Sequence, residues 1–324
     1  MTMTSRPTTL LSATVLAAAI WGCDGPAGQP MVTDARTSYW RTPTGNGQQI
    51  DTAHYRIFTT ATSRELLSHL PGFMEAAHRN YLALTGLPER AGAERMDIYM
   101  MGTRPEWAEL TKSRLGAQAG MYLGIEAGGY CYDKVCVFWD MGGLGTFSTA
   151  AHEGLHQFFA HRMRDQLPAW LEEGLCAVAE GYEVTERNVT FTPDRNNPRF
   201  SNLRQVITQG RWHPLDKLLP MHAGDITGQV GERSVEYYGQ LWALAQFIRS
   251  SPGYRGGLAR LLADAEAGRL REAMKPSPGD VNRLGGVEYN RAMSEPLFRR
   301  YISDDLESFE RQFRSFAVKL AKLP

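Results

Sequence analysis

Two histidines four residues apart, with a glutamate beside the first, are the residues whose types and spacing best fit chemistry. They are His152, Glu153 and His156 in the stretch TAAHEGLHQFF. At this separation the two imidazoles share one face of a helix and can bind a single zinc ion. Glu153 would then stand beside the metal, where it can take a proton from a water molecule that zinc has made more acidic. The pattern predicts a zinc-dependent hydrolase.

The alternative is an ordinary amphipathic helix, in which the histidines are hydrogen-bonded core residues. The apolar side chains of Phe158 and Phe159 are compatible with that alternative. A third protein ligand would decide the matter, because a catalytic zinc site uses three protein ligands and keeps one position open.

The metzincin arrangement does not supply that ligand. It places a glycine three residues, and a third histidine six residues, after the second histidine. Here those positions hold Phe159 and Arg162. His161 is one residue out of register, so we expect it to be exposed or to support the site from outside the ligand set.

The next predicted helix carries a more informative segment. It reads PAWLEEGL from Pro168 to Leu175, and a proline suits the first turn of a helix. Together with HEGLH about a dozen residues earlier, it resembles the peptidase MA-like gluzincins of bacteria. Their recurring form is HExxH followed by a helix with the pattern Pro-x-Trp-Leu-x-Glu-Gly-Leu-Ala. Cys176 stands where alanine is usual, so a small residue is retained.

The resemblance implies a ligand set, one Zn²⁺ per chain and a reaction. Glu173, before the glycine, would be the third ligand and Glu172 would not. A short turn at about 164–167 would make the two helices antiparallel and bring Glu173 to the histidines. The implied reaction is hydrolysis of peptide bonds, with a peptide or protein as substrate and Glu153 as general base. Gluzincins often hydrogen-bond the oxyanion with a tyrosine, for which Tyr238 is the candidate; its alternative role is packing between helices.

Two other functions stay open. One is a catalytically silent relative that keeps the fold as a binding or envelope-assembly module. The intact set of His152, Glu153, His156 and Glu173 argues against it. The other is a zinc hydrolase that acts on a non-peptide bond.

The elements that must position these residues follow an α+β pattern. Strands are predicted in the first half of the chain, and helices dominate the second half. The strands are expected at 54–60, 95–102, 120–129 and 130–140. This predicts a gluzincin-like domain over 49–324, in which a small mixed sheet at about 49–145 is followed by a helical subdomain at about 146–324 that begins with the active-site helix pair. From the resemblance, residues 135–140 are expected to form the edge strand along which the substrate backbone lies.

The N-terminus predicts export. An apolar run from about Leu10 to Trp21 has the length of a signal-peptide core and is too short to span a bilayer. It ends at Gly22-Cys23, which resembles the bacterial lipoprotein processing site. We expect a signal peptide over 1–23, lipidation of Cys23, and membrane contact only through that anchor. The alternative is a plain secretory signal and a periplasmic or secreted protein. Residues 24–48, rich in Gly, Pro, Thr and Gln, predict a flexible tether.

The segment YCYDKVCVFW predicts a hairpin with the two-residue turn Asp133-Lys134. Cys131 and Cys136 would then form a close cross-strand pair, for which we expect a disulfide, as an exported protein permits. The alternative is two free, half-buried thiols. Cys176 lies in an apolar helix and is expected to be a core residue.

The charge balance argues against one class of partner. The chain has 35 Lys and Arg and 35 Asp and Glu, which gives a formal net charge of zero. Nucleic-acid binding proteins usually show a basic excess, so no nucleic-acid partner is predicted.

Overall fold

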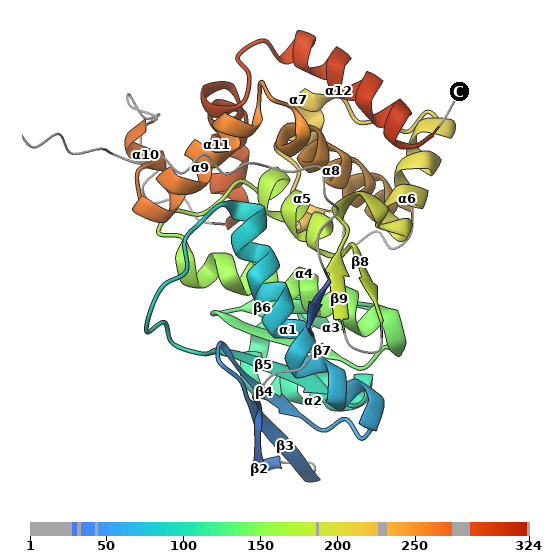
Figure 1. The fold of residues 1–324 in the computed structure, drawn as a ribbon. Coiled ribbons are helices and arrows are strands. Elements are labelled where there is room, and N and C mark those ends of the chain that lie inside the picture. The colour runs from blue at the N-terminus through green and yellow to red at the C-terminus, as the bar shows by residue number, and fades with distance from the viewer. Residues whose placement is uncertain are drawn as a thin grey trace, which may run out of the picture.

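The computed structural model describes residues 28–30, 34–42, 45–185, 188–225, 232–273 and 286–322. Within them a strand-bearing part built from the first half of the chain lies below a helical part built from the second half (Figure 1). The predicted α+β class is therefore confirmed. No helix in the described ranges is long and apolar enough to cross a membrane. The signal peptide and Cys23 lie outside the described residues.

The main sheet has six strands and mixed directions. Across the sheet they are β2 (Arg36–Thr42), β3 (Gly45–Asp51), β4 (Tyr55–Thr59), β5 (Met96–Met101), β7 (Val135–Trp139) and β6 (Gly129–Tyr132). The central strands β4, β5 and β7 run parallel, whereas the β2–β3–β4 and β7–β6 pairs are antiparallel. The predicted strands at 54–60 and 95–102 are confirmed as β4 and β5.

The edge strand differs from the prediction. β7 is paired on both sides, so the prediction that residues 135–140 form the edge is wrong. Asp133 and Lys134 both have positive φ, 48° and 63°, which makes the predicted hairpin turn a tight two-residue one. This turn folds β6 back along β7, and β6 becomes the outer strand of the described sheet.

The predicted tether over 24–48 is also corrected, because β2 and β3 form a regular hairpin there. The polar composition hides strands whose register is continuous from Arg36, opposite Asp51, to Thr42, opposite Gly45. The ring of Trp40 anchors the hairpin, with its centroid 5.3 Å from that of Phe58. Part of this segment is therefore an extension of the sheet.

The predicted strand at 120–129 is wrong for most of its length. Helix α2 (Arg104–Leu115) is followed by the short helices η1 (Gly116–Gln118) and α3 (Gly120–Leu123), and only Gly129 belongs to a strand. Arg104 explains the irregular course, since its guanidinium donates to the carbonyl oxygens of Leu123 and Ile125 at 2.9 and 3.0 Å.

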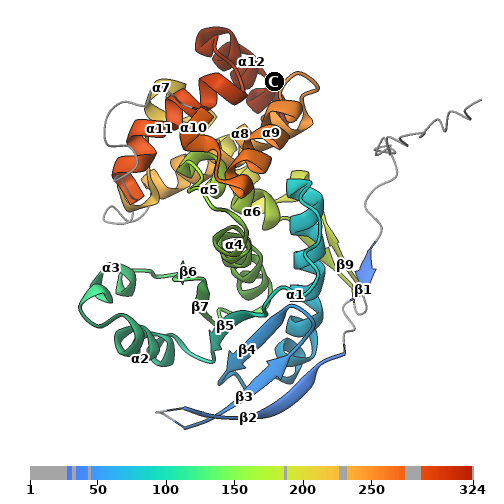
Figure 2. The same ribbon diagram turned by 90° about the vertical axis from the view of Figure 1, so that its left-hand side faces the viewer.

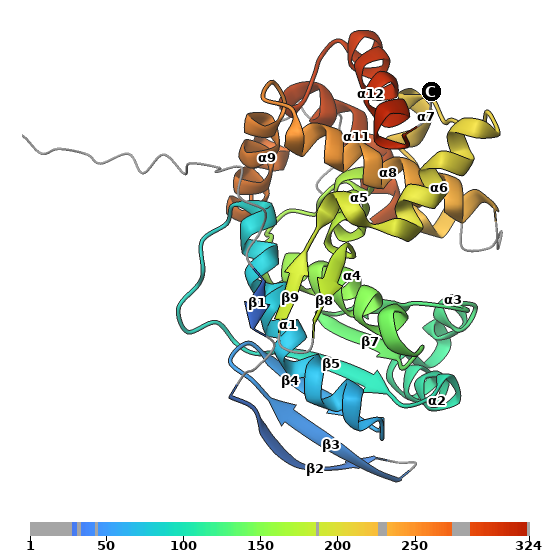
Figure 3. The ribbon, with the colours of Figure 1, turned by 45° about the vertical axis from the view of Figure 1, so that its right-hand side comes forward.

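Four helices that pack around the site contribute many of the core residues: α1 (Arg64–Thr85), α4 (Gly143–Arg162), α5 (Ala169–Ala179) and α8 (Glu232–Ser250). In the view of Figure 2, α4 lies between the sheet and the helical part. The remaining helices are η2 (Pro193–Arg195), α6 (Asn197–Thr208), α7 (Leu215–Leu218), η3 (Ala223–Asp225), α9 (Arg255–Ala267), α10 (Leu270–Ala273), α11 (Gly286–Tyr301) and α12 (Leu306–Leu320). A small sheet, β1 (Gln29–Pro30), β9 (Asn188–Phe191) and β8 (Tyr182–Val184), lies beside α1 (Figure 3).

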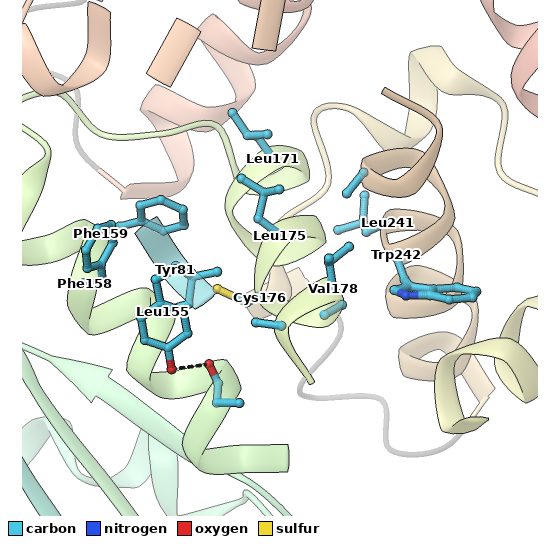
Figure 4. Close-up of a cluster of buried hydrophobic side chains, with 14 of the residues drawn as sticks. Tyr81, Leu155, Phe158, Phe159, Leu171, Leu175, Cys176, Val178, Leu241 and Trp242 are labelled. Atoms are coloured by element: carbon cyan, nitrogen blue, oxygen red, sulfur yellow. Dashed lines mark hydrogen bonds between the residues drawn. The ribbon is translucent and has the colours of Figure 1, made fainter. Parts of the chain in front are cut away.

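Two glycines explain how closely these helices approach one another. A Cβ on Gly154 of α4 would lie 2.5 Å from the Tyr81 hydroxyl of α1, and one on Gly174 of α5 would lie 2.9 Å from the Leu241 carbonyl oxygen of α8. The Tyr81 hydroxyl donates to the Ala151 carbonyl oxygen at 2.8 Å, next to His152 (Figure 4). Any larger residue would force these helices apart, so both glycines of the HEGLH and EEGL segments have a packing role.

Candidate active site

The histidines and Glu173 meet where α4 and α5 pack against each other. The two helices are joined by residues 163–168, as the predicted turn requires. The Nε2 atoms of His152 and His156 are 3.2 Å apart. Oε2 of Glu173 lies 3.4 Å from Nε2 of His152 and 3.5 Å from Nε2 of His156. The three atoms form a nearly equilateral triangle, which we call the ligand triangle.

This triangle has the dimensions of a tetrahedral zinc site. Zinc–nitrogen and zinc–oxygen bonds of about 2.1 Å put neighbouring ligands about 3.4 Å apart. Oε2 of Glu173 is also buried without a hydrogen-bond partner. A buried carboxylate oxygen without a partner is unfavourable unless a cation neutralises it. The residues present therefore fit a zinc ion.

Two carboxylates hold the far sides of the imidazoles. Nδ1 of His152 is 2.7 Å from Oε1 of Glu180, and Nδ1 of His156 is 2.8 Å from Oε1 of Glu172. A carboxylate at Nδ1 keeps the proton on that nitrogen and leaves the lone pair of Nε2 directed at the triangle. Glu172 thus lies on the outer side of His156, whereas Glu173 faces the inner nitrogens.

Glu180 and Arg199 were missed by the sequence reasoning. Arg199, on α6, donates to both carboxylate oxygens of Glu180, at 2.8 and 2.6 Å, and Asn196 donates at 3.2 Å. Glu180 could have been found, because it follows Glu173 by seven residues and so returns to the same helix face after two turns. Arg199 could not, since only the packing of α6 brings it there.

The carboxylates dominate the electrostatics of the site. Burial opposes protonation of His152, but the nearby carboxylates of Glu173 and Glu180 outweigh this and raise its pKa to about 9. Burial would raise the pKa of Glu180, yet the charge of Arg199 and the bond to His152 lower it to about 2. Against the same effect of burial, the charge of His156 keeps the pKa of Glu173 well below its ordinary value. The site thus attracts positive charge, which protons or a metal ion can supply.

Glu153 lies on the side of α4 that faces the sheet, apart from the orienting carboxylates Glu172 and Glu180. It is 8% exposed, and burial raises the pKa of its carboxyl group, partly opposed by the charges of His152 and His156. A Cβ on Gly129 of β6 would lie 3.2 Å from Cγ of Glu153. The glycine therefore lets the outer strand pass close to Glu153.

Tyr238 lies at the same site. Its ring centroid is 6.2 Å from that of His152, and the Arg199 guanidinium carbon is 4.8 Å from it. Burial raises the pKa of the phenol far above its ordinary value, so the hydroxyl is a donor at neutral pH. The ring packs between Arg199 and His152, so the packing role and a hydroxyl available to a ligand are both compatible with its position.

His161 and Cys176 fall outside the ligand triangle. Nε2 of His161 is 3.3 Å from the Lys134 carbonyl oxygen at the hairpin turn, so His161 supports the hairpin. The sulfur of Cys176 lies within 4.8 Å of donor nitrogens of His152 and His156. Burial raises the pKa of this thiol to about 12 in the metal-free protein. Glu173 is the better third ligand, because its Oε2 lies 3.4 and 3.5 Å from the two Nε2 atoms and has no other hydrogen-bond partner.

The predicted Cys131–Cys136 disulfide is corrected. The two residues do face each other across the hairpin, as predicted, but both are free thiols. Sγ of Cys136 instead donates to the Glu153 carbonyl oxygen at 2.9 Å. The thiol of the buried strand is thereby engaged with α4, which links the hairpin to the active-site helix.

Comparison with known proteins adds no family, because no family model and no curated protein matches the chain.

Proposed function

We propose that this protein is a gluzincin-type zinc metallopeptidase that hydrolyses peptide bonds outside the cytoplasm. The observation that carries the proposal is the ligand triangle with its unpartnered buried Glu173 oxygen. A zinc ion held by His152, His156 and Glu173 would supply the Lewis acidity that makes water a nucleophile at neutral pH. A silent binding module has no need of this arrangement together with a buried carboxylate at Glu153.

Glu153 is the proposed general base. It follows the first ligand along α4, so the helix fixes its position relative to the triangle. Its buried carboxylate would take the proton of the attacking water and then pass it to the leaving amine. The raised pKa of this group favours the first step, because a stronger base takes the proton of the attacking water more readily. Tyr238, protonated and beside His152, is the proposed donor to the developing oxyanion.

The outer strand favours a peptide over a non-peptide substrate. In a hairpin with a two-residue turn, Tyr132 pairs with Val135 by hydrogen bonds, so the backbone groups of Cys131 and Gly129 point to the open side of β6. An extended peptide could add to this edge by main-chain hydrogen bonds. Because Gly129 adjoins Glu153, a peptide on this edge would pass the proposed base. We therefore move the expected substrate strand from residues 135–140 to β6.

The test is a paired measurement on one preparation of Glu153→Gln. Zinc content is measured by elemental analysis, and turnover by mass spectrometry of a diverse peptide library. We expect full zinc content and a loss of turnover of about a hundredfold to ten-thousandfold, because the substitution keeps the size but removes the proton acceptor. Glu109→Gln, on α2 and exposed, is the matched control and should keep both.

Two results would contradict the proposal. Undiminished turnover with full zinc would mean that Glu153 is not the base. Zinc-loaded protein that cleaves no peptide in the library, with Glu153 intact, would favour the silent binding module or a hydrolase of another bond.

A further inference from the structure

A second cluster of metal-ligating side chains lies on α1 and its neighbours, outside the site described above. His54 directly precedes β4, His78 belongs to α1, and Glu89 follows α1 in the loop that leads to β5. One donor atom from each residue lies within 4.8 Å of the other two. Oε2 of Glu89 is 3.6 Å from Nδ1 of His78 and 3.9 Å from Nε2 of His54. We call these three residues the second cluster.

His54 is oriented as a metal-binding histidine would be. Its Nδ1 is 2.7 Å from Oε2 of Glu75, and its backbone N–H donates to Oε1 of the same carboxylate at 2.9 Å. Glu75 thus occupies the far nitrogen and leaves Nε2 directed at Glu89, as Glu180 and Glu172 do for the histidines of the ligand triangle.

His78 supplies an independent indication of a ligand. The residue is 5% exposed, and its Nδ1 is buried without any hydrogen-bond partner. The nearest carboxylate oxygen, on Glu89, is too distant for a hydrogen bond. A buried imidazole nitrogen with no partner calls for an explanation, and an ion that is bound between His78 and Glu89 would provide one.

Protonation of both imidazoles does not suit this arrangement. The rings of His54 and His78 are stacked, with centroids 3.9 Å apart and planes 11° from parallel. Two protonated imidazoles in this position would repel each other, because like charges this close are unfavourable. One cation shared by both rings and a carboxylate avoids the repulsion.

We propose that His54, His78 and Glu89 bind a second divalent transition metal ion of the zinc class, with Glu75 as the residue that positions His54. Two imidazoles and one carboxylate form a donor set that suits such ions. Ligands of tetrahedral zinc are about 3.4 Å apart, so Glu89 must approach by a few tenths of an ångström and the rings must tilt. Glu89 can move, because its side chain is 48% exposed on a loop.

The proposed role of this ion is structural. It would tie the start of β4, the middle of α1 and the loop after α1 together. Helix α1 in turn supports the active-site helix through the Tyr81 hydroxyl at the Ala151 carbonyl oxygen. The ion would therefore stabilise the support of the active site without taking part in the reaction.

The experiment counts zinc in the purified protein after removal of metal, reconstitution with Zn²⁺ and desalting. We expect two zinc ions per wild-type chain, one in His54→Gln, one in His156→Ala and none in the double variant. Glu89→Gln should also bind one, whereas Glu94→Gln, exposed on the same loop, should bind two. Circular dichroism of the metal-free variants checks that each is folded. The side chains of His54 and Glu89 are partly exposed, so we expect their glutamine variants to fold.

The outcomes separate this proposal from the proposed function. One zinc in the wild type that is lost in His156→Ala, or two zincs that are both retained in His54→Gln, would overturn the second site. One zinc lost in His54→Gln but retained in His156→Ala would support the second site and contradict the ligand triangle.

Discussion

The ligand triangle and the second cluster are built from the same residue types but differ in how closely their ligand atoms approach and in how many of their histidines a carboxylate orients. The triangle is closed, with distances of 3.2, 3.4 and 3.5 Å, and a carboxylate orients each imidazole. The second cluster is open, with 3.6 and 3.9 Å to Glu89, and a carboxylate orients only His54. The triangle is thus preorganised for an ion, whereas the second cluster must rearrange to bind one.

The difference comes from the elements that supply the third ligand. Glu173 projects from a packed helix and is 13% exposed in its side chain, whereas Glu89 projects from a loop and is 48% exposed. Ordering an exposed loop side chain costs conformational entropy, and a packed helical one has already lost that freedom. We therefore expect the triangle to bind zinc more tightly than the second cluster does.

The largest expected effect comes from removing one ligand of the triangle. Glu173→Ala should lose the zinc of the triangle, and with it all turnover, because two histidines alone bind weakly. Its neighbour Glu172 is the matched control, since Glu172→Ala should keep the ion with an affinity lower by about 10- to 100-fold. Zinc titration with a competing chelator measures both.

The same titration distinguishes Glu173 from Cys176. Cys176→Ser should retain the zinc of the triangle, since the three ligand atoms of His152, His156 and Glu173 are unchanged. Loss of the ion in Cys176→Ser together with its retention in Glu173→Ala would assign the third ligand to the cysteine.

A smaller effect is expected when the carboxylate that orients a histidine is replaced by an amide at either cluster. Glu180→Gln should weaken zinc binding at the triangle, and Glu75→Gln should weaken it at the second cluster, each by about 10- to 100-fold. Each variant is the control for the other, because the unaltered cluster should keep its affinity. The His54→Gln background removes the second cluster, so it reports the zinc affinity of the triangle. The His156→Ala background removes the triangle, so it reports the zinc affinity of the second cluster. A change at both clusters from one substitution would show a general loss of structure instead.

The smallest effect is a pH dependence of the stability that zinc confers. Burial lowers the pKa of His152, but Glu173 and Glu180 outweigh burial. They raise this pKa from an ordinary value near 6.5 to about 9 in the metal-free protein. A raised pKa stabilises the metal-free fold fully below about pH 6.5, and this contribution is lost as the pH rises to about 9. Zinc must displace that proton, so it binds more tightly over the same interval.

The loss of stability in the metal-free fold and the gain in zinc affinity express the same proton exchange, so the Tm difference between zinc-loaded and metal-free protein should widen from about pH 6.5 to about pH 9. Each tenfold gain in affinity is about 1.4 kcal/mol, which amounts to a few degrees in Tm. Calorimetry of the His54→Gln protein isolates the triangle. A constant difference across this interval would mean that His152 does not exchange a proton for the metal.

The sequence alone determined the part of the site that is local. His152 and His156 share a face because they are four residues apart on one helix, and Glu173 reaches them because a short turn makes the next helix antiparallel. The Asp133-Lys134 hairpin is local in the same way, since the turn itself sets the opposition of Cys131 and Cys136. Such features depend on helix period and turn geometry, which the chain encodes over a few residues.

Only the tertiary structure decided which distant segments meet. The pairing of Arg199 with Glu180, the place of β6 at the edge of the sheet, and the meeting of His54 with Glu89 all depend on how whole elements pack. No short-range pattern marks them, because the residues involved are spaced by loops rather than by a helix or strand period. The polar hairpin of β2 and β3 escaped prediction for a related reason: its strands are stabilised by pairing with β4 and by the rings around Trp40, rather than by an apolar pattern of their own.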